Sequence, residues 1–288
     1  MSAPPPPRGW RRRSSFSWTA RVGMVIATAI VLVGLVGPFF APDGPADTIG
    51  AAYGNPSSGH PFGLDYLGRD VLSRFLWGGR TALVMALLAT LLGYAIGLSI
   101  GLAAAYSRGI FGGLLMRASD VLLAFPGMIF VLLLLSAYGS SITLVIVAVA
   151  LANAPRIARI VRAAALEVVD LAYVEAARIR GERAWYVTLR EILPNIKSPI
   201  LVDFGVRVTG SILLVASVSF LGFGLQPPSA DWGLIVSENR AGMTIQPWSV
   251  VPAVAAIGLL TVAINLIIDG YRGSADGIGL AEHVARSR

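Results

Sequence analysis

Long uncharged stretches alternate with short charged ones along this chain. Residues 22–42, 81–107 and 121–155 carry no charge for 21, 27 and 35 residues respectively. A run of about 20 apolar residues is long enough to cross a bilayer as a helix. Because two spans and a turn do not fit within 35 residues, we expect the third span to begin before Asp120 and the fourth to continue past Arg156.

Two further apolar stretches, 198–225 and 250–268, bring the expected number of spans to six. The first of them contains Asp203 and Arg207, whose i, i+4 spacing permits an ion pair on one helix face. We therefore expect an all-α, polytopic membrane protein. The expected organisation is a disordered basic tail at 1–20, a first span at 21–42, an exterior segment at 43–79, a core domain at 80–272 and a cytosolic tail at 273–288. Within the core we expect spans at 80–107, 113–136, 141–161, 198–225 and 249–269, a cytosolic loop at 162–197 and an exterior loop at 226–248.

Small residues recur along the second span at a spacing that lets helices approach closely. Gly93, Gly97 and Gly101 stand at every fourth position, a pattern typical of helix packing in lipid. We expect this face to pack against another helix, although glycine is also common in membrane helices without such a role. Just before this span, residues 71–77 are expected to form a short amphipathic helix at the outer membrane face.

Ionisable side chains predict one local pair and no metal site. Arg117 and Asp120 lie one helical turn apart near the expected inner interface, where they can neutralise each other. The chain has two histidines, His60 and His283, at distant positions, and no cysteine. His60 is therefore not expected to bind a metal, and neither a disulfide framework nor a thiolate metal site is available.

Composition supports a membrane location and explains the positive charge. Hydrophobic residues make up 55% and charged residues 14%, against roughly 25% charged residues in soluble domains. With the amino terminus inside, only Arg69, Arg74, Arg80 and Arg240 of the 23 basic residues are placed outside. This is the positive-inside bias, so the net charge of +7 does not require a nucleic-acid partner, and both termini are expected in the cytosol.

The most polar part of the chain is an island from about residue 156 to 197, which we expect to form two short helices joined at Gly181. Asp170 can cap the first helix, and Glu175 can pair with Arg178 one turn further on. Glycine accepts the left-handed conformation in which helices often end, so Gly181 is expected to end the first helix. Pro194 is expected to stop the second helix.

Within this island, Ala176 and Ala177 leave a small, flat surface that another protein could approach closely. The simpler interpretation is an ordinary cytosolic loop, and the local pattern does not decide between the two.

Several motifs resemble those of a known family. Glu175-Ala-Ala, Gly181 and Leu193-Pro194 resemble the signature cytosolic loop of ABC-importer permeases. Two residues depart from the family pattern: Arg180 replaces an apolar residue, and Glu191 stands where Ile or His is usual. Further stretches resemble the C-type subunit of the dipeptide and oligopeptide permeases, namely residues 60–74, 219–228 with 232–233, 247–248 and 265–270.

The resemblance implies a type I importer fold and a transport subunit rather than an enzyme. It implies a homologous second permease subunit, two ATPase subunits and an extracytoplasmic binding protein as partners, in the cell membrane of a prokaryote. It also implies that Glu175, Ala176, Ala177 and Gly181 dock an ATPase through a coupling helix. The sequence contains no Gly-x-x-x-x-Gly-Lys-Ser/Thr phosphate loop, so we expect no cofactor on this chain and ATP with Mg²⁺ on the partner ATPases.

Di- or oligopeptides are the substrates that the resemblance favours, and nickel or another small solute is the alternative within the family. Two other classes of protein stay open. An ion-gradient-driven transporter would need charged or strongly polar groups near the membrane midplane, where Asn153 and Asn265 are the best polar candidates. A scaffold subunit would use the loop at 162–197 only to recruit a partner.

Overall fold

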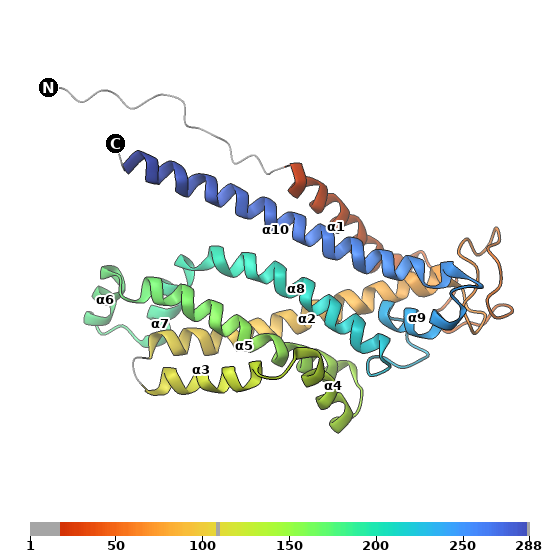
Figure 1. The fold of residues 1–288 in the computed structure, drawn as a ribbon, viewed down its shortest axis with the longest axis horizontal. Coiled ribbons are helices and arrows are strands. Elements are labelled where there is room, and N and C mark those ends of the chain that lie inside the picture. The colour runs from red at the N-terminus through yellow and green to blue at the C-terminus, as the bar shows by residue number, and fades with distance from the viewer. Residues whose placement is uncertain (1–17, 108–109, 287–288) are drawn as a thin grey trace.

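The computed structural model describes residues 18–107 and 110–286 of the 288-residue chain, and side chains as far as Tyr271. The described chain consists of helices joined by loops, with two isolated β-bridges. Its long helices run roughly along one common direction (Figure 1). These are α1 (Trp18–Val36), α2 (Val71–Tyr106), α3 (Ile110–Leu123), α5 (Ile142–Val169), α8 (Lys197–Phe220) and α10 (Val251–Arg286), whereas α4 (Gly127–Tyr138) turns away from α3. Shorter helices are α6 (Ala172–Ile179), α7 (Ala184–Tyr186) and α9 (Trp232–Asn239), with single turns at η1 (Gly37–Phe39), η4 (Arg240–Gly242) and η5 (Pro247–Ser249).

Five helices are each long and apolar enough to cross a membrane: α1, α2, α5, α8 and α10. The pair α3 and α4 is a sixth candidate if the two helices are counted as one span. The expected all-α, polytopic fold is therefore confirmed.

The third span differs from the straight helix expected at 113–136. The axes of α3 and α4 differ by 84°, and the break between them contains Pro126. Proline lacks the N–H that a continuing helix needs, and it disfavours the helical conformation in the residue before it. Phe125 is that residue, so the sequence ends α3 and restarts the chain as α4 at Gly127.

The separate amphipathic helix expected at residues 71–77 does not form, because these residues are the first two turns of α2. Asp70 caps this helix, since its Oδ2 accepts a hydrogen bond of 2.7 Å from the Ser73 backbone N–H. The 36 residues of α2 extend over about 54 Å at about 1.5 Å per residue. That is longer than the hydrocarbon core of about 30 Å, so α2 projects beyond it.

The glycine face of α2 packs against α5, as its spacing predicts. A Cβ added at Gly97 would lie 2.6 Å from Ile157 Cβ and 2.8 Å from the Ala154 carbonyl oxygen. A Cβ at Gly101 would lie 2.7 Å from the Ala158 carbonyl oxygen. Only a hydrogen atom fits at these positions, which explains why the two backbones approach so closely.

Two helices extend further than expected. The fourth span was expected to end at residue 161, but α5 continues through Pro155 to Val169. The backbone of α10 is helical to Arg286, so most of the tail expected at 273–288 prolongs the last helix. The basic tail expected at 1–20 lies outside the described residues, except for the start of α1.

Ion pairs and hydrogen bonds join the spans. The expected pair of Asp203 and Arg207 is present at 2.9 Å, and the Tyr94 hydroxyl donates to Asp203 over 2.7 Å. The expected pair of Arg117 and Asp120 does not form. Asp120 pairs instead with Arg159 of α5 at 2.6 Å, because the packing of α3 on α5 brings this more distant partner within reach.

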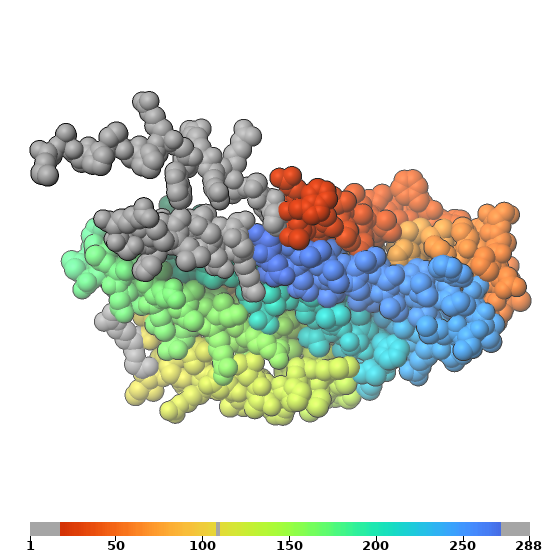
Figure 2. Space-filling view, turned by 45° about the horizontal axis from the view of Figure 1, so that its top comes forward, coloured from red at the N-terminus to blue at the C-terminus, as the bar shows by residue number. Residues whose placement is uncertain are grey.

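The two segments expected outside, 43–79 and 226–248, lie side by side at the end of the bundle opposite α6 (Figures 1 and 2). A buried cluster of charges joins them, and no sequence pattern predicts it. Arg69 contacts Asp65 at 2.7 Å and Glu238 at 3.2 Å. Arg74 contacts Asp65 at 3.3 Å and Glu238 at 2.6 Å. All four side chains are at most 7% exposed.

Candidate functional site

The polar island folds at one end of the bundle, where α6 connects the end of α5 to the segment before α8 (Figure 1). Asp170 was expected to cap α6, but the N-cap residue is Leu171, which makes no side-chain cap hydrogen bond. Asp170 is instead the C-cap of α5. Because α5 runs on to Val169, only two residues separate the spanning helix from α6.

Gly181 turns the chain at the end of α6, as expected. Its φ angle is +78°, a conformation that non-glycine residues adopt at a cost of about 1–2 kcal/mol. A Cβ at this position would meet no atom within 4 Å. Glycine is therefore needed here for its backbone conformation and not for lack of space.

The second half of the island is less regular than the single helix that we expected. After α7, the chain forms a π-helical turn, η2 (Val187–Ile192), and then a 3₁₀ turn, η3 (Leu193–Asn195). Pro194 lies in this 3₁₀ turn, and α8 starts two residues after η3 ends. Pro194 therefore does not stop a single second helix as expected, because it lies within the 3₁₀ turn that follows η2.

One face of α6 is buried within the chain itself. Val174 and Ala177 are 0% exposed and pack in one apolar cluster with Val187 and Ile192 of η2. Ala177 was expected to offer a docking surface, and its burial shows that it cannot do so in this structure. Its small side chain instead lets α6 lie close to η2.

The same apolar cluster contains the ends of two spanning helices. Ala105 near the end of α2 and Val161, Ala165 and Val169 of α5 belong to it. A displacement of α6 must therefore move these helix ends or open the packing between them, because close-packed interiors deform little.

The opposite face of the island is exposed and partly apolar. Glu175 and Ala176 are exposed on α6, beside Ile179, whose exposure is 80%. Trp185 and Leu189 on the following turns are 59% and 50% exposed. Large apolar side chains gathered at an exposed surface are typical of a protein–protein contact.

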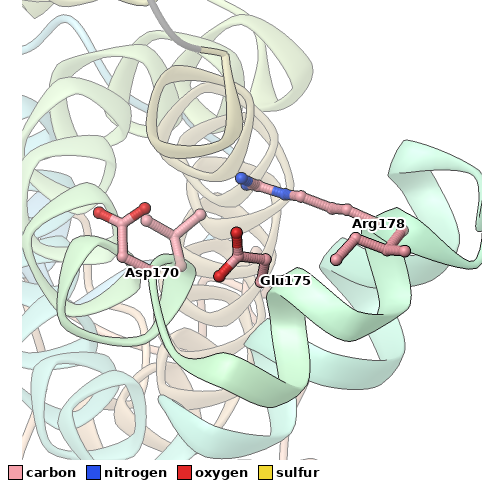
Figure 3. A pocket seen from close by; sticks show the side chains of 5 residues that line it. Asp170, Glu175 and Arg178 are labelled. Carbon is pink, nitrogen blue, oxygen red and sulfur yellow. The ribbon is translucent and has the colours of Figure 1, made fainter.

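A recess of about 480 Å³ opens beside α6, lined by Asp170, Glu175 and Arg178 together with Val169 and Ile179. In the view of Figure 3, the side chain of Arg178 extends toward the side of the recess on which Glu175 and Asp170 lie. The expected pair of Glu175 and Arg178 is absent among the described contacts. The guanidinium carbon of Arg178 lies 4.6 Å from the ring centre of Tyr106, the last residue of α2, a cation–π contact.

Two nitrogens of Arg178, Nε and Nη2, are enclosed and make no hydrogen bond within the described chain. The carboxylate of Glu175 makes no hydrogen bond or ion pair with any described residue either, although its backbone N–H donates to the Leu171 carbonyl within the helix. An unpaired enclosed donor is costly, so the recess can gain stability from a partner that supplies an acceptor to Arg178 and a donor to Glu175.

Tyr173 is the titrating group of α6 with a shifted pKa. Burial, and secondly the negative charge of Glu191, raise its pKa above the ordinary value of 10.0, so its phenol stays neutral at physiological pH. The described residues of the island hold no cluster of His, Asp and Glu that could bind a metal; the one such cluster in the described chain lies at the opposite end of the bundle.

Sequence reasoning missed Tyr106 and Trp185 as parts of this site. Tyr106 is 72 residues before Arg178, and no local pattern links them. The burial of Ala177, in contrast, has a sequence signal, since Val174 and Ala177 are three residues apart and therefore share one helix face.

Comparison with known proteins identifies the family. Residues 93–274, more than half of the chain, match the family described as "Binding-protein-dependent transport system inner membrane component". The chain is 42% identical over 221 residues to the glutathione transport system permease protein GsiD of Pectobacterium atrosepticum, covering 77% of this chain and 73% of that protein. The protein of the same name from Shigella dysenteriae is likewise 42% identical over 221 residues, with the same coverage.

Solved structures show the same fold at low sequence identity. An inward-facing structure of the MetNI methionine ABC transporter gives a TM-score of 0.52 at 18% identity, covering 69% of this chain and 96% of that chain. A crystal structure of an amino acid ABC transporter with histidines gives a TM-score of 0.53 at 22% identity, covering 68% of this chain and 91% of that chain. The chain therefore belongs to the multi-pass inner-membrane permeases of binding-protein-dependent ABC importers, as a non-enzymatic transport subunit of the C-type dipeptide and oligopeptide branch.

Proposed function

We propose that this chain pairs with a second, homologous permease subunit and lines an import pathway for small peptides. Two ATPase subunits supply the movement from the cytosol, and a binding protein delivers the cargo from outside. The chain itself binds no cofactor, and ATP with Mg²⁺ belongs to the ATPases. The observation that carries this proposal is the two-sided character of α6, which is packed into the chain on one face and exposed on the other.

The proposed coupling mechanism follows from these two faces. Glu175 and Ala176 contact the ATPase, and Gly181 sets the turn after the contact helix. Ala177 acts from the buried side, where it holds α6 against η2. When the ATPase moves, α6 transmits the displacement to the ends of α2 and α5, because all three share one apolar cluster.

This mechanism requires that α6 and both termini lie in the cytosol. The positive-inside distribution of basic residues supports that orientation. The chain contains no cysteine, so single cysteines introduced at Ala176 and at Ala52, at the opposite end of the bundle, can be labelled without background. We expect a membrane-impermeant thiol reagent applied to intact cells to label Ala52→Cys and to spare Ala176→Cys. The reverse pattern would refute the mechanism.

Small peptides are the cargo that the relatives favour. The matched proteins from Pectobacterium and Shigella are named glutathione transport permeases, and glutathione is itself a small peptide. Uptake of labelled glutathione and of a dipeptide by the complete transporter tests this assignment. Uptake of nickel without either peptide would instead support the alternative cargo.

Two substitutions on the exposed face of α6 test the coupling role. Ala176→Trp adds a large side chain to the contact surface, and Glu175→Ala removes its acidic group. We expect both variants to reach the membrane in normal amounts but to lose co-purification with the ATPase and uptake. The matched controls are Ala52→Trp at the opposite end and Glu167→Ala, an exposed glutamate of α5. Normal uptake by Ala176→Trp would exclude docking through this face.

A further inference from the structure

Three side chains that can bind metals meet at the end of the bundle opposite α6. Asp43 follows η1, His60 lies in the connecting loop, and Asp70 caps α2. One ligand atom from each lies within 4.8 Å of the others. His60 Nδ1 is 3.2 Å from Asp70 Oδ1 and 3.8 Å from Asp43 Oδ2. The imidazole therefore faces both carboxylates.

The surrounding contacts hold the carboxylate of Asp70 and the backbone of Asp43 in place. Asp70 is fully buried at its side chain, and its two oxygens have separate roles. Oδ2 accepts from the Ser73 backbone at the start of α2, while Oδ1 faces His60. The backbone N–H of Asp43 donates to the Ser73 hydroxyl over 3.1 Å. Ser73 thus anchors both acidic residues, and a ligand would meet a site that is already ordered.

One oxygen of this group has no partner within the chain. Asp43 Oδ2 is enclosed by the protein and makes no hydrogen bond, and its separation of 3.8 Å from His60 Nδ1 is too long for one. An enclosed carboxylate oxygen without a donor is costly. A cation between Asp43 and His60 would satisfy it.

We propose that Asp43, His60 and Asp70 bind a divalent transition-metal cation of the Zn²⁺ or Mn²⁺ type. Imidazole nitrogen and carboxylate oxygen bind such ions at about 2.0–2.2 Å, which places neighbouring donors about 3.4 Å apart in a tetrahedron. The observed separations of 3.2 and 3.8 Å bracket that value.

Charge and donor type define the expected cation further. Two carboxylates balance a charge of +2. Asp70 Oδ2 accepts a hydrogen bond from the start of α2, whose partial positive charge would otherwise oppose a cation. The imidazole nitrogen favours zinc-like ions over Mg²⁺, which prefers oxygen ligands. Three protein ligands leave at least one coordination position for water. Because the protein does not fill the coordination shell, we expect the ion to exchange with the surrounding solution. It would tie the loop around residue 60 to the start of α2.

The competing explanation is a histidine that only donates a hydrogen bond to Asp70. His60→Gln separates the two explanations, because the glutamine amide can still donate a hydrogen bond but is a poor ligand for zinc. The chain also offers two matched controls. His283→Gln removes the only other histidine, and Asp47→Asn alters a carboxylate of the same exterior segment that caps the Gly44 backbone and does not belong to the cluster.

The experiment is equilibrium binding of Zn²⁺ to the purified full-length chain in lipid nanodiscs, after removal of any affinity tag, with Mg²⁺ as the comparison ion. We expect one Zn²⁺ per chain, and a loss of affinity of at least about tenfold in His60→Gln and Asp43→Asn, since even outer-sphere changes weaken metal sites by about 10–100-fold. His283→Gln and Asp47→Asn should bind as the unaltered chain does.

Co²⁺ in place of Zn²⁺ gives a second measurement, because its visible absorption reports the ligand geometry and should disappear in His60→Gln. Absence of stoichiometric Zn²⁺ binding would overturn the proposal. So would binding that survives in His60→Gln and Asp43→Asn, or binding that only His283→Gln removes. The site lies far from α6, so either result leaves the proposed coupling role unaffected.

Discussion

The packing of Gly97 against α5 gives a prediction whose size follows from the coordinates. Gly97→Ala would place a Cβ 2.6 Å from Ile157 Cβ and 2.8 Å from the Ala154 carbonyl oxygen. Carbon atoms in favourable contact are about 3.5–4.0 Å apart, so α2 and α5 would have to separate by about 1 Å. Overpacking of this kind destabilises proteins by about 1–3 kcal/mol.

Replacing glycine by alanine also stabilises a helix by about 1 kcal/mol. A control substitution of glycine by alanine at an unpacked helical position allows this contribution to be subtracted. Gly258 lies within α10, where an added Cβ would meet no atom within 4 Å. Gly258→Ala should therefore be neutral or stabilising. We expect the free energy of unfolding of Gly97→Ala to lie about 1–3 kcal/mol below that of Gly258→Ala.

The measurement is chemical unfolding of the detergent-solubilised chain, followed by tryptophan fluorescence. Gly93→Ala offers a graded comparison, because its Cβ would lie 3.1 Å from its nearest neighbour and should be less destabilising than the change at Gly97. Equal stability of Gly97→Ala and Gly258→Ala would refute the inference that the absence of a Cβ holds α2 and α5 together.

The remaining predictions concern a turn, an ion cluster and a buried acid. At Gly181, alanine should weaken ATPase co-purification and uptake more than asparagine, because asparagine tolerates the left-handed conformation; equal losses would refute a backbone role. Glu238→Gln removes one of the two carboxylates that pair with Arg69 and Arg74 and should lower the free energy of unfolding by about 3–5 kcal/mol. The same change at exposed Glu167 should have little effect. Burial raises the pKa of Asp231 from 3.8 to about 6, so the folded state holds this proton more tightly than the unfolded state does. Stability should then fall by about 3 kcal/mol as the pH rises from about 4 to 6, and Asp231→Asn, which retains a helix cap, should lose that dependence.

Features that depend on nearby residues could be predicted from the sequence. Apolar stretches gave the spans, and spacing along one helix gave the Asp203–Arg207 pair and the glycine face of α2. The turn at Gly181 followed from the same local reasoning. In each case the relevant residues lie within one continuous segment of the chain, where helix geometry alone fixes their relative positions.

Features that depend on tertiary packing could not be predicted in this way. Asp120 has a suitable partner three residues away in Arg117, yet it pairs with Arg159 because α3 packs on α5. The cluster of Asp43, His60 and Asp70 is a second example. These residues lie 10 or more positions apart in the sequence, so the spacing along a single helix does not predict their contact. The sequence offers His60 no second histidine nearby, whereas the fold places the carboxylates of Asp43 and Asp70 beside its imidazole.

The buried charge cluster has a consequence for biogenesis. Arg74 is translated 164 residues before Glu238, and their side chains meet at 2.6 Å only in the finished bundle. A nascent chain that has inserted α2 but not yet α9 therefore carries two arginines with a single acidic neighbour, Asp65. Chains truncated before residue 226 should keep this excess of positive charge and become substrates for membrane proteases, so the cluster can act as a checkpoint for completed synthesis.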